Sequence, residues 1–223
     1  MTTETEITPG IRNITEFEAK AILREYGITT PRGIVFETLP DTIDLRFPLV
    51  LKVSDTSIIH KSDVGGVKAG IMGIYDLLEE YGAMKKRFPH SEFLLEEMAP
   101  KGVEFIVGMT RDPVFGPVIM LGTGGIYTEL YHDVAFRKLP IGRPDALDMI
   151  QEIRSGVFCK GFRGTKIDCE KIADLLLKVS GMISGGKLDI LTMDINPVIV
   201  SAAGAVAADA KISFTVEEQN NIP

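Results

Sequence analysis

The spacing of apolar residues predicts a chain that mixes helices with strands. The first helix is expected in "NITEFEAKAILREYG", where apolar side chains recur at helical spacing: Phe17, Ala21, Ile22 and Tyr26. Either Asn13 or Thr15 can cap its start, and Gly27 ends it. The same reasoning predicts further helices at 75–87, 144–155 and 168–183.

Short apolar runs bounded by polar or turn-forming residues predict the strands. These runs lie at 28–36, 47–54, 67–74, 92–100, 102–112, 117–125, 135–141, 191–200 and 205–214. The runs 102–112 and 117–125 are expected to pair antiparallel across a loop at Asp112 and Pro113.

The order of these elements indicates an α+β fold, because strands and helices do not alternate as regular βαβ units. Acidic residues and Pro100 interrupt the pattern near 96–100. We therefore expect a polar tail at 1–11, a first subdomain at 12–95 and a second at 96–223.

Composition and charge exclude some classes of binding partner and indicate a cellular compartment. The chain has 223 residues and a net charge of −7, with no basic tract, so neither nucleic acid nor an anionic membrane is an expected partner. No apolar run approaches the roughly 18–20 residues of a membrane span. Cys159 and Cys169 lack metal-ligand spacing and are expected to be free thiols in a reducing cytoplasm, where we place the protein.

Two charged residues stand where apolar or turn residues are expected. Lys52 lies inside the predicted buried strand 47–54, either as a salt-bridged structural lysine or as a point charge for a phosphate. In "IIHKSDVGGV", His60 and Lys61 precede a glycine pair. From spacing alone, His60 can carry a phosphoryl group or simply hydrogen-bond a neighbouring loop.

Oxygen donors gather near the end of the chain. Asp194, Asn196 and Asp209 are expected near the ends of two short paired strands, where they suit Mg²⁺ carrying nucleotide phosphates. Turn chemistry explains the same residues. The glycines of 122–129 allow either a turn or an anion-binding loop. The sequence has no Walker-type GxxxxGK[ST], HExxH or CxxC motif.

Taken in order, these segments resemble the β subunit of ADP-forming acetate–CoA ligase (acetyl-CoA synthetase). The resemblance runs through "IIHKSDVGGV", "GTGGIYTELYHDVAFRKLPI", "GFRG" and "MDINPVIV…AADAKI", over most of 12–215. That family belongs to the ATP-grasp superfamily and is related to the β subunit of succinyl-CoA synthetase, which lacks the "HKSDVGG" element.

The resemblance implies an ATP-grasp fold, with two α+β subdomains gripping ATP or ADP between their sheets. Lys52 would contact the phosphates, Glu104 the ribose region, and Asn196 and Asp209 would hold Mg²⁺. A hinge strand beside adenine would be formed by Glu96, Glu97 and Met98.

The resemblance also implies a phosphoryl relay. His60 would carry the phosphoryl group, Lys61 would offset its charge, and Arg137 would stabilise the charge in transfer. Glycines near the phosphates or in the moving segment would be Gly65, Gly66, Gly124 and Gly125.

A CoA-binding segment is missing from the chain, and the family places that module on an α subunit. We therefore expect an enzyme complete only in complex, as an α2β2 heterotetramer, that converts acyl-CoA, ADP and phosphate to acid, ATP and CoA. Two alternatives remain: a succinyl-CoA synthetase-like β subunit, or an ATP-binding regulatory subunit without phosphotransfer.

Overall fold

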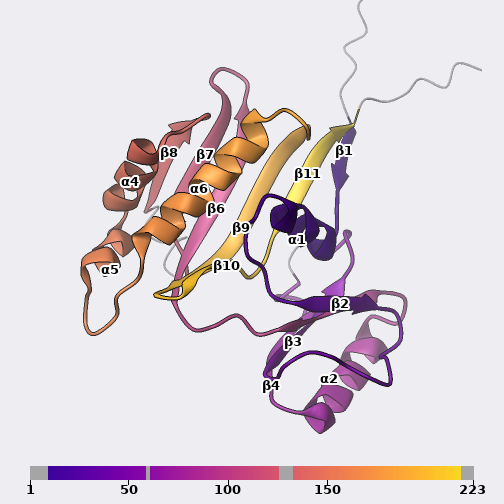
Figure 1. Ribbon diagram of the computed structural model, residues 1–223. Coiled ribbons are helices and arrows are strands. Elements are labelled where there is room, and N and C mark those ends of the chain that lie inside the picture. The colour runs from indigo at the N-terminus through magenta and orange to yellow at the C-terminus, as the bar shows by residue number, and fades with distance from the viewer. Residues whose placement is uncertain (1–9, 59–60, 126–132, 217–223) are drawn as a thin grey trace, which may run out of the picture.

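The computed structural model describes residues 10–58, 61–125 and 133–216, and it confirms the α+β class (Figure 1). In the described residues the strands form two antiparallel sheets. The larger sheet contains β1 (Gly10–Asn13), β6 (Val103–Asp112), β7 (Gly116–Thr123), β8 (Val134–Lys138), β9 (Ile190–Ser201), β10 (Gly204–Ala207) and β11 (Lys211–Val216). The smaller sheet contains β2 (Gly33–Phe36), β3 (Leu49–Ser54), β4 (Val67–Ile71) and β5 (Glu92–Glu97).

Each sheet has its own helices and its own core. The helices are α1 (Glu16–Glu25), α2 (Ile74–Arg87), α4 (Arg143–Glu152), α5 (Val157–Lys160) and α6 (Cys169–Ser184), with a 3₁₀ turn at Arg154–Gly156. Apolar residues of α1, α4 and α6 share one core with the larger sheet, whereas α2 packs on the smaller sheet (Figure 1). No helix in the described ranges is long and apolar enough to cross a membrane.

Helix α1 starts as predicted but buries a different face. Thr15 caps it: the Thr15 N–H donates to Glu18 Oε2 (2.8 Å), and the Glu18 N–H donates to Thr15 Oγ1 (3.3 Å). The residues that it buries most fully are Glu16, Ala19, Lys20 and Leu23, whereas Ile22 and Tyr26 of the predicted set are partly buried against the same core. Sequence spacing missed this face because two of its four members are charged.

The predicted hairpin of β6 and β7 is confirmed, with Asp112 opposite Gly116. The prediction of one strand over 205–214 is wrong, because the chain breaks between β10 and β11, and Asp209 lies in that connection. Asp194 and Asn196 are also inside the long strand β9 and not at the end of a short one.

The start of the chain belongs with the larger sheet. Strand β1 pairs with β11, and Ala19 and Leu23 of α1 lie in the larger core. The smaller sheet therefore extends from Gly33 to Glu97. The expected tail falls partly on β1, and its residues 1–9 are outside the described ranges. Whether 12–95 and 96–223 are separate subdomains stays a prediction.

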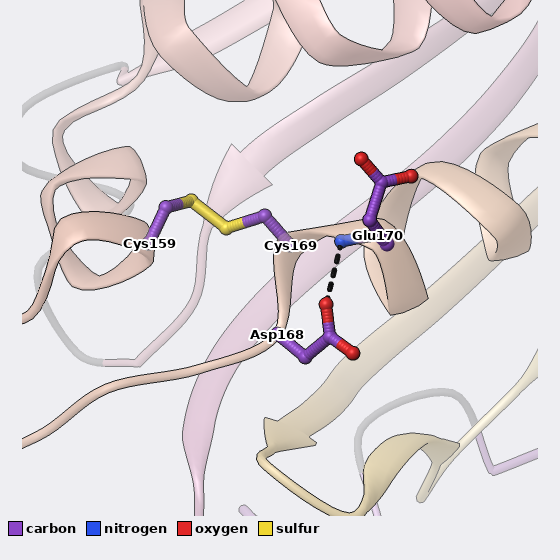
Figure 2. Close-up of a disulfide and its surroundings, with 4 residues drawn as sticks. All are labelled: Cys159, Asp168, Cys169 and Glu170. Carbon is purple, nitrogen blue, oxygen red and sulfur yellow. Dashed lines mark hydrogen bonds between the residues drawn. A yellow bond between two sulfur atoms is a disulfide. The ribbon is translucent and has the colours of Figure 1, made fainter.

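The expectation of two free thiols is wrong, because Cys159 and Cys169 form a disulfide (Figure 2). The fold brings the end of α5 beside the start of α6, where the Ile167 N–H donates to the Phe158 carbonyl oxygen (3.2 Å). The two Cα atoms are then 5.5 Å apart. Asp168 caps α6 next to the bridge by accepting from the Glu170 N–H (3.1 Å).

Candidate functional site

A cavity of about 290 Å³ lies between the two sheets, and both contribute to its walls. Val50 and Lys52 line it from the smaller sheet, and Asn196 and Ile199 from β9. Asp209, in the β10–β11 connection, completes this side. The fold thus brings together six of the predicted site residues from distant parts of the sequence: Lys52, Glu96, Glu97, Met98, Asn196 and Asp209.

A second cavity, of about 170 Å³, adjoins the first, since Asn196 and Asp209 line both. Its other charged lining residues are of both signs: Asp63, Asp194, Lys61 and Lys211. The two cavities therefore form one cleft, which is more apolar towards Val50 and Ile199 and more charged towards Asp194.

Alternation along β9 directs the acidic and amide groups into this cleft. Met193 and Ile195 are buried in the core, so Asp194 and Asn196 face the opposite side of the sheet. Lys211 of β11 lies opposite Asp194 in the antiparallel register. Burial raises the pKa of the Asp194 carboxyl, and the positive charge of Lys211 offsets this only in part.

Asp209 is held beside Asn196 by the backbone. The Ala208 N–H donates to the Pro197 carbonyl oxygen (2.9 Å), which ties the β10–β11 connection to β9. Burial raises the pKa of Asp209 despite the nearby ammonium group of Lys52. Because a cation favours the ionised carboxylate, this position would gain from a bound metal ion.

The oxygen donors fit Mg²⁺ that arrives with a phosphate. Mg²⁺ in nucleotide sites is held by one or two carboxylates together with substrate phosphates and water. Asp194, Asn196 and Asp209 provide two carboxylates and an amide oxygen. In the described part of the chain, no group of at least three His, Cys, Asp or Glu side chains could hold a metal ion. The donor set therefore suits a metal–nucleotide complex better than a metal held by protein alone.

Lys52 is buried, with 5% of its surface exposed, and it lines the cavity. Its ammonium group donates to Glu16 Oε1 and to the Ala208 carbonyl oxygen (3.1 Å), and it lies 3.2 Å from Glu96 Oε2. Burial disfavours the charged lysine, but the surrounding carboxylates outweigh this effect and raise its pKa. Lys52 is therefore both salt-bridged and placed to meet an anion.

Sequence reasoning missed two buried charges on α1. Glu16 accepts from Lys20 (2.8 Å) and Lys61 (3.2 Å) as well as from Lys52. Lys20 is fully buried and also contacts Glu96 Oε2 (2.6 Å). We call Glu16, Lys20, Lys52 and Glu96 the buried charge cluster. Burial alone would raise the pKa of Glu16, but Lys52, Lys20 and Lys61 lower it to about 2.

A sequence signal for these residues does exist. Glu16 and Lys20 are four positions apart, and they share a helix face with Ala19 and Leu23. Charged residues on the buried face of an amphipathic helix need partners, and here the partners come from the smaller sheet.

The three predicted hinge residues have different surroundings. All three line the cavity, but Glu96 is also buried in the charge cluster, to which Glu97 and Met98 do not belong. The Met98 N–H donates to the Pro48 carbonyl oxygen (2.9 Å), and Glu97 Oε1 accepts from the Arg46 N–H (3.2 Å). This segment therefore forms a fixed edge of the cleft.

Glu104, Gly124 and Gly125 lie together, one strand beyond the cavity wall. The Gly124 N–H donates to the Glu104 carbonyl oxygen (2.8 Å), and Glu104 pairs across strands with Ile199, which lines the cavity. A Cβ at Gly124 would lie 2.6 Å from the Glu104 carbonyl carbon. Gly125 has a φ of +87°. Both glycines are thus required by the backbone path.

The segment after His60 forms a tight turn against β3. The Gly66 N–H donates to the Lys61 carbonyl oxygen (2.6 Å), and the Gly66 carbonyl oxygen accepts from the Val53 N–H (2.8 Å). Gly65 has a φ of +66°, which favours glycine. This turn places Lys61 at the second cavity. His60 itself lies outside the described residues.

The structure does not bring Arg137 to the cleft. Arg137 pairs across strands with the buried core residue Ile119, so its side chain is on the helix-covered face of the sheet. There it forms an ion pair with Glu152 of α4. Arg137 is therefore not placed to stabilise a phosphoryl group in the cleft, contrary to the expectation from the resemblance.

Comparisons with known proteins show which family and which relatives this chain matches. The ATP-grasp domain family matches residues 7–214. The acetate–CoA ligase [ADP-forming] I subunit beta of Pyrococcus furiosus is 38% identical over 213 residues, which cover 90% of this chain and 91% of that protein. The acetate–CoA ligase [ADP-forming] II of Archaeoglobus fulgidus is also 38% identical, over 88% of this chain but only 30% of its own length.

A solved structure shares the fold. The dinucleotide forming acetyl-coenzyme A synthetase 1 of Ca. Korarchaeum cryptofilum was solved with coenzyme A and Mg-AMPPCP, its phosphohistidine segment pointing towards the nucleotide binding site. This chain is similar to it with a TM-score of 0.80 and 37% identity, over 92% of this chain and 93% of that one.

Proposed function

Since this chain belongs to the ATP-grasp family and is homologous to the β subunits of ADP-forming acetate–CoA ligases, we propose that it binds the nucleotide for an ADP-forming acyl-CoA synthetase. The observation that carries the proposal is the meeting of Lys52, Asn196 and Asp209 from two sheets at one cleft. An ammonium group, an amide oxygen and a carboxylate are the groups that a Mg²⁺-nucleotide requires.

The cleft suggests how a nucleotide would lie. Its more apolar part, at Val50, Met98 and Ile199, would take the adenine, and Lys52 would contact the phosphates. Asn196 and Asp209 would hold Mg²⁺, with Asp194 nearby. When bound, Mg²⁺ would neutralise phosphate charge, which is the main requirement of phosphoryl transfer.

His60 would carry the phosphoryl group to ADP. Its neutral imidazole nitrogen is nucleophilic near pH 7. When the phosphoryl group passes from His60 to ADP, the N–P bond breaks and its electron pair returns to the imidazole. A β-phosphate oxygen of ADP forms the new bond to phosphorus. The neighbouring Lys61 supports this role because it lines the cavity that contains Asp194 and Asp209.

A CoA-binding α subunit would complete the enzyme. The chain spans 91% of the Pyrococcus furiosus β subunit but about a third of the Archaeoglobus fulgidus ligase. We propose that the remaining functions reside on a separate chain, in an α2β2 complex. The acyl group is left open, since its pocket would lie mainly on that chain.

The test separates nucleotide binding from the relay. Asp209→Asn should weaken ADP binding only when Mg²⁺ is present, whereas Asp41→Asn, which changes an exposed aspartate, should bind as the parent does. His60→Ala should keep ADP affinity but abolish turnover of the complex and the acid-labile, base-stable phosphate label on the chain. Equal Mg²⁺ dependence of Asp209→Asn and the parent would refute the metal assignment. Near-parental turnover by His60→Ala would refute the relay.

A further inference from the structure

A single carboxylate contacts two of the three lysines that line the cleft, Lys52 and Lys61 but not Lys211. Glu16 Oε1 accepts from Lys52, and Glu16 Oε2 accepts from Lys61 (3.2 Å). Lys52 lines the first cavity and Lys61 the second. The separation of the two ammonium groups is therefore set by the two oxygens of one side chain.

That side chain is itself fixed. Glu16 lies in the capped first turn of α1, and only 2% of its side chain is exposed. Lys20, one helical turn later, donates to Glu16 (2.8 Å), to Glu96 Oε2 (2.6 Å) and to the Ala208 carbonyl oxygen (2.7 Å). The carboxylate cannot rotate without breaking contacts to three ammonium groups.

We infer that Glu16 and Lys20 are positioning residues for a nucleoside di- or triphosphate: Glu16 spaces Lys52 and Lys61 for its phosphate groups, and Lys20 orients Glu16. This inference rests on the proposed function, because it requires the phosphates to bind in this cleft. Charges that are already in place need no reorganisation when the ligand arrives, and the gain applies only to its phosphate groups.

A positioning role of Glu16 can be separated from a purely structural one by restoring the charge balance of the cluster without restoring the carboxylate. The buried charge cluster contains two carboxylates and two ammonium groups, and its charges balance. Glu16→Gln leaves two buried ammonium groups with one carboxylate, and removing one partner of a buried ion pair is strongly destabilising. Glu16→Gln/Lys20→Met restores the balance, with Glu96 facing Lys52, but removes the carboxylate that spaces Lys52 and Lys61.

The experiment measures the thermal midpoint and the dissociation constants of Mg²⁺-ADP and adenosine for the full chain. Glu16→Gln should lower the midpoint and raise the dissociation constant of Mg²⁺-ADP by about tenfold or more. The double variant should recover most of the midpoint yet keep the weak Mg²⁺-ADP binding, with adenosine bound as by the parent. The control is Glu25→Gln, an equal charge change at an exposed position of α1, which should match the parent in all three measurements.

Two results would overturn the inference. One is parental affinity for Mg²⁺-ADP in the double variant, and the other is a proportional loss of adenosine binding, which would indicate a general change in the cleft. If Glu16→Gln does not fold, the Mg²⁺-ADP and adenosine affinities of the double variant still test the inference. If the parent chain itself fails to bind Mg²⁺-ADP, the proposed function fails and this inference with it. If the parent binds and the double variant binds equally well, only this inference fails.

Discussion

Reduction of the Cys159–Cys169 disulfide should lower the thermal midpoint of the protein and leave nucleotide affinity unchanged. The bridge closes a loop with a sequence separation of 10 residues, between α5 and α6. Both cysteines pack against the core on the helix-covered face of the larger sheet, whereas Asp194 and Asn196 face the other side. The two effects are therefore expected to be independent.

The magnitude follows from the length of the closed loop. For a loop of about 10 residues, the chain-entropy relation gives a stabilisation of about 2.7 kcal/mol at 25 °C. In a protein of this size, 1 kcal/mol shifts the midpoint by about 2–4 °C, so reduction should lower it by about 5–10 °C.

The assay compares the midpoint with and without reductant, beside a count of alkylated thiols under denaturing conditions. The parent should show no reactive thiol before reduction and two after it. A Cys159→Ser/Cys169→Ser variant serves as control, since its midpoint should not respond to reductant. Two reactive thiols in the unreduced parent would refute the disulfide. An unchanged midpoint despite reduction would refute the loop-closure reasoning.

Three further predictions follow from the site. Gly124→Ala should lower the free energy of unfolding by about 1–3 kcal/mol, because the new Cβ would meet the Glu104 backbone. The control is Gly82→Ala in α2, where a new Cβ meets nothing within 4 Å and the change should be neutral or slightly stabilising. Denaturant titration measures the free energy of unfolding of both variants. Glu16 has a folded-state pKa of about 2, lowered from 4.5, so its ionised form stabilises the fold above pH 4.5 and this stabilisation is lost as the pH falls towards 2. Between pH 5 and 2, the free energy of unfolding of the parent should fall by about 3 kcal/mol more than that of Glu16→Gln, as measured by denaturant titration at each pH. The purified chain alone should form no acyl-CoA from acid, ATP and CoA, and turnover without a partner subunit would contradict the division of functions proposed above.

The parts of the fold that depend on local sequence were predictable. The β6–β7 hairpin and the capping of α1 by Thr15 are both encoded within a few residues, by alternation and by a capping box. The break between β10 and β11 was not predictable, because "AVAADAKISF" mixes apolar and polar residues without a clear turn signal. There the chain follows its tertiary contact, the hydrogen bond from Ala208 to Pro197.

The candidate site divides in the same way. Lys52 was found because a charge interrupts an apolar strand, and Asp194 and Asn196 were found as oxygen donors expected near strand ends; both signals are visible locally. The contacts of Lys20 in the charge cluster could not be found from the sequence, since its partners Glu96 and Ala208 lie 76 and 188 residues further along the chain. The disulfide was missed because the sequence argument concerned the compartment, whereas the bridge depends on where α5 ends beside α6.

The buried charge cluster links the position of the sheets to the chemistry of the cleft. Glu16 and Lys20 belong to a helix of the larger sheet, and Lys52 and Glu96 to strands of the smaller one, so each ion pair between them crosses the junction. Well-packed apolar residues at such a junction are often at least as stable as a buried ion pair. An apolar junction, however, would not fix the distance from Lys52 to Asp209, which is 3.9 Å here, or place Lys61 beside the same carboxylate. The charges at this junction are therefore better explained by the geometry they impose on the cleft than by the stability they add.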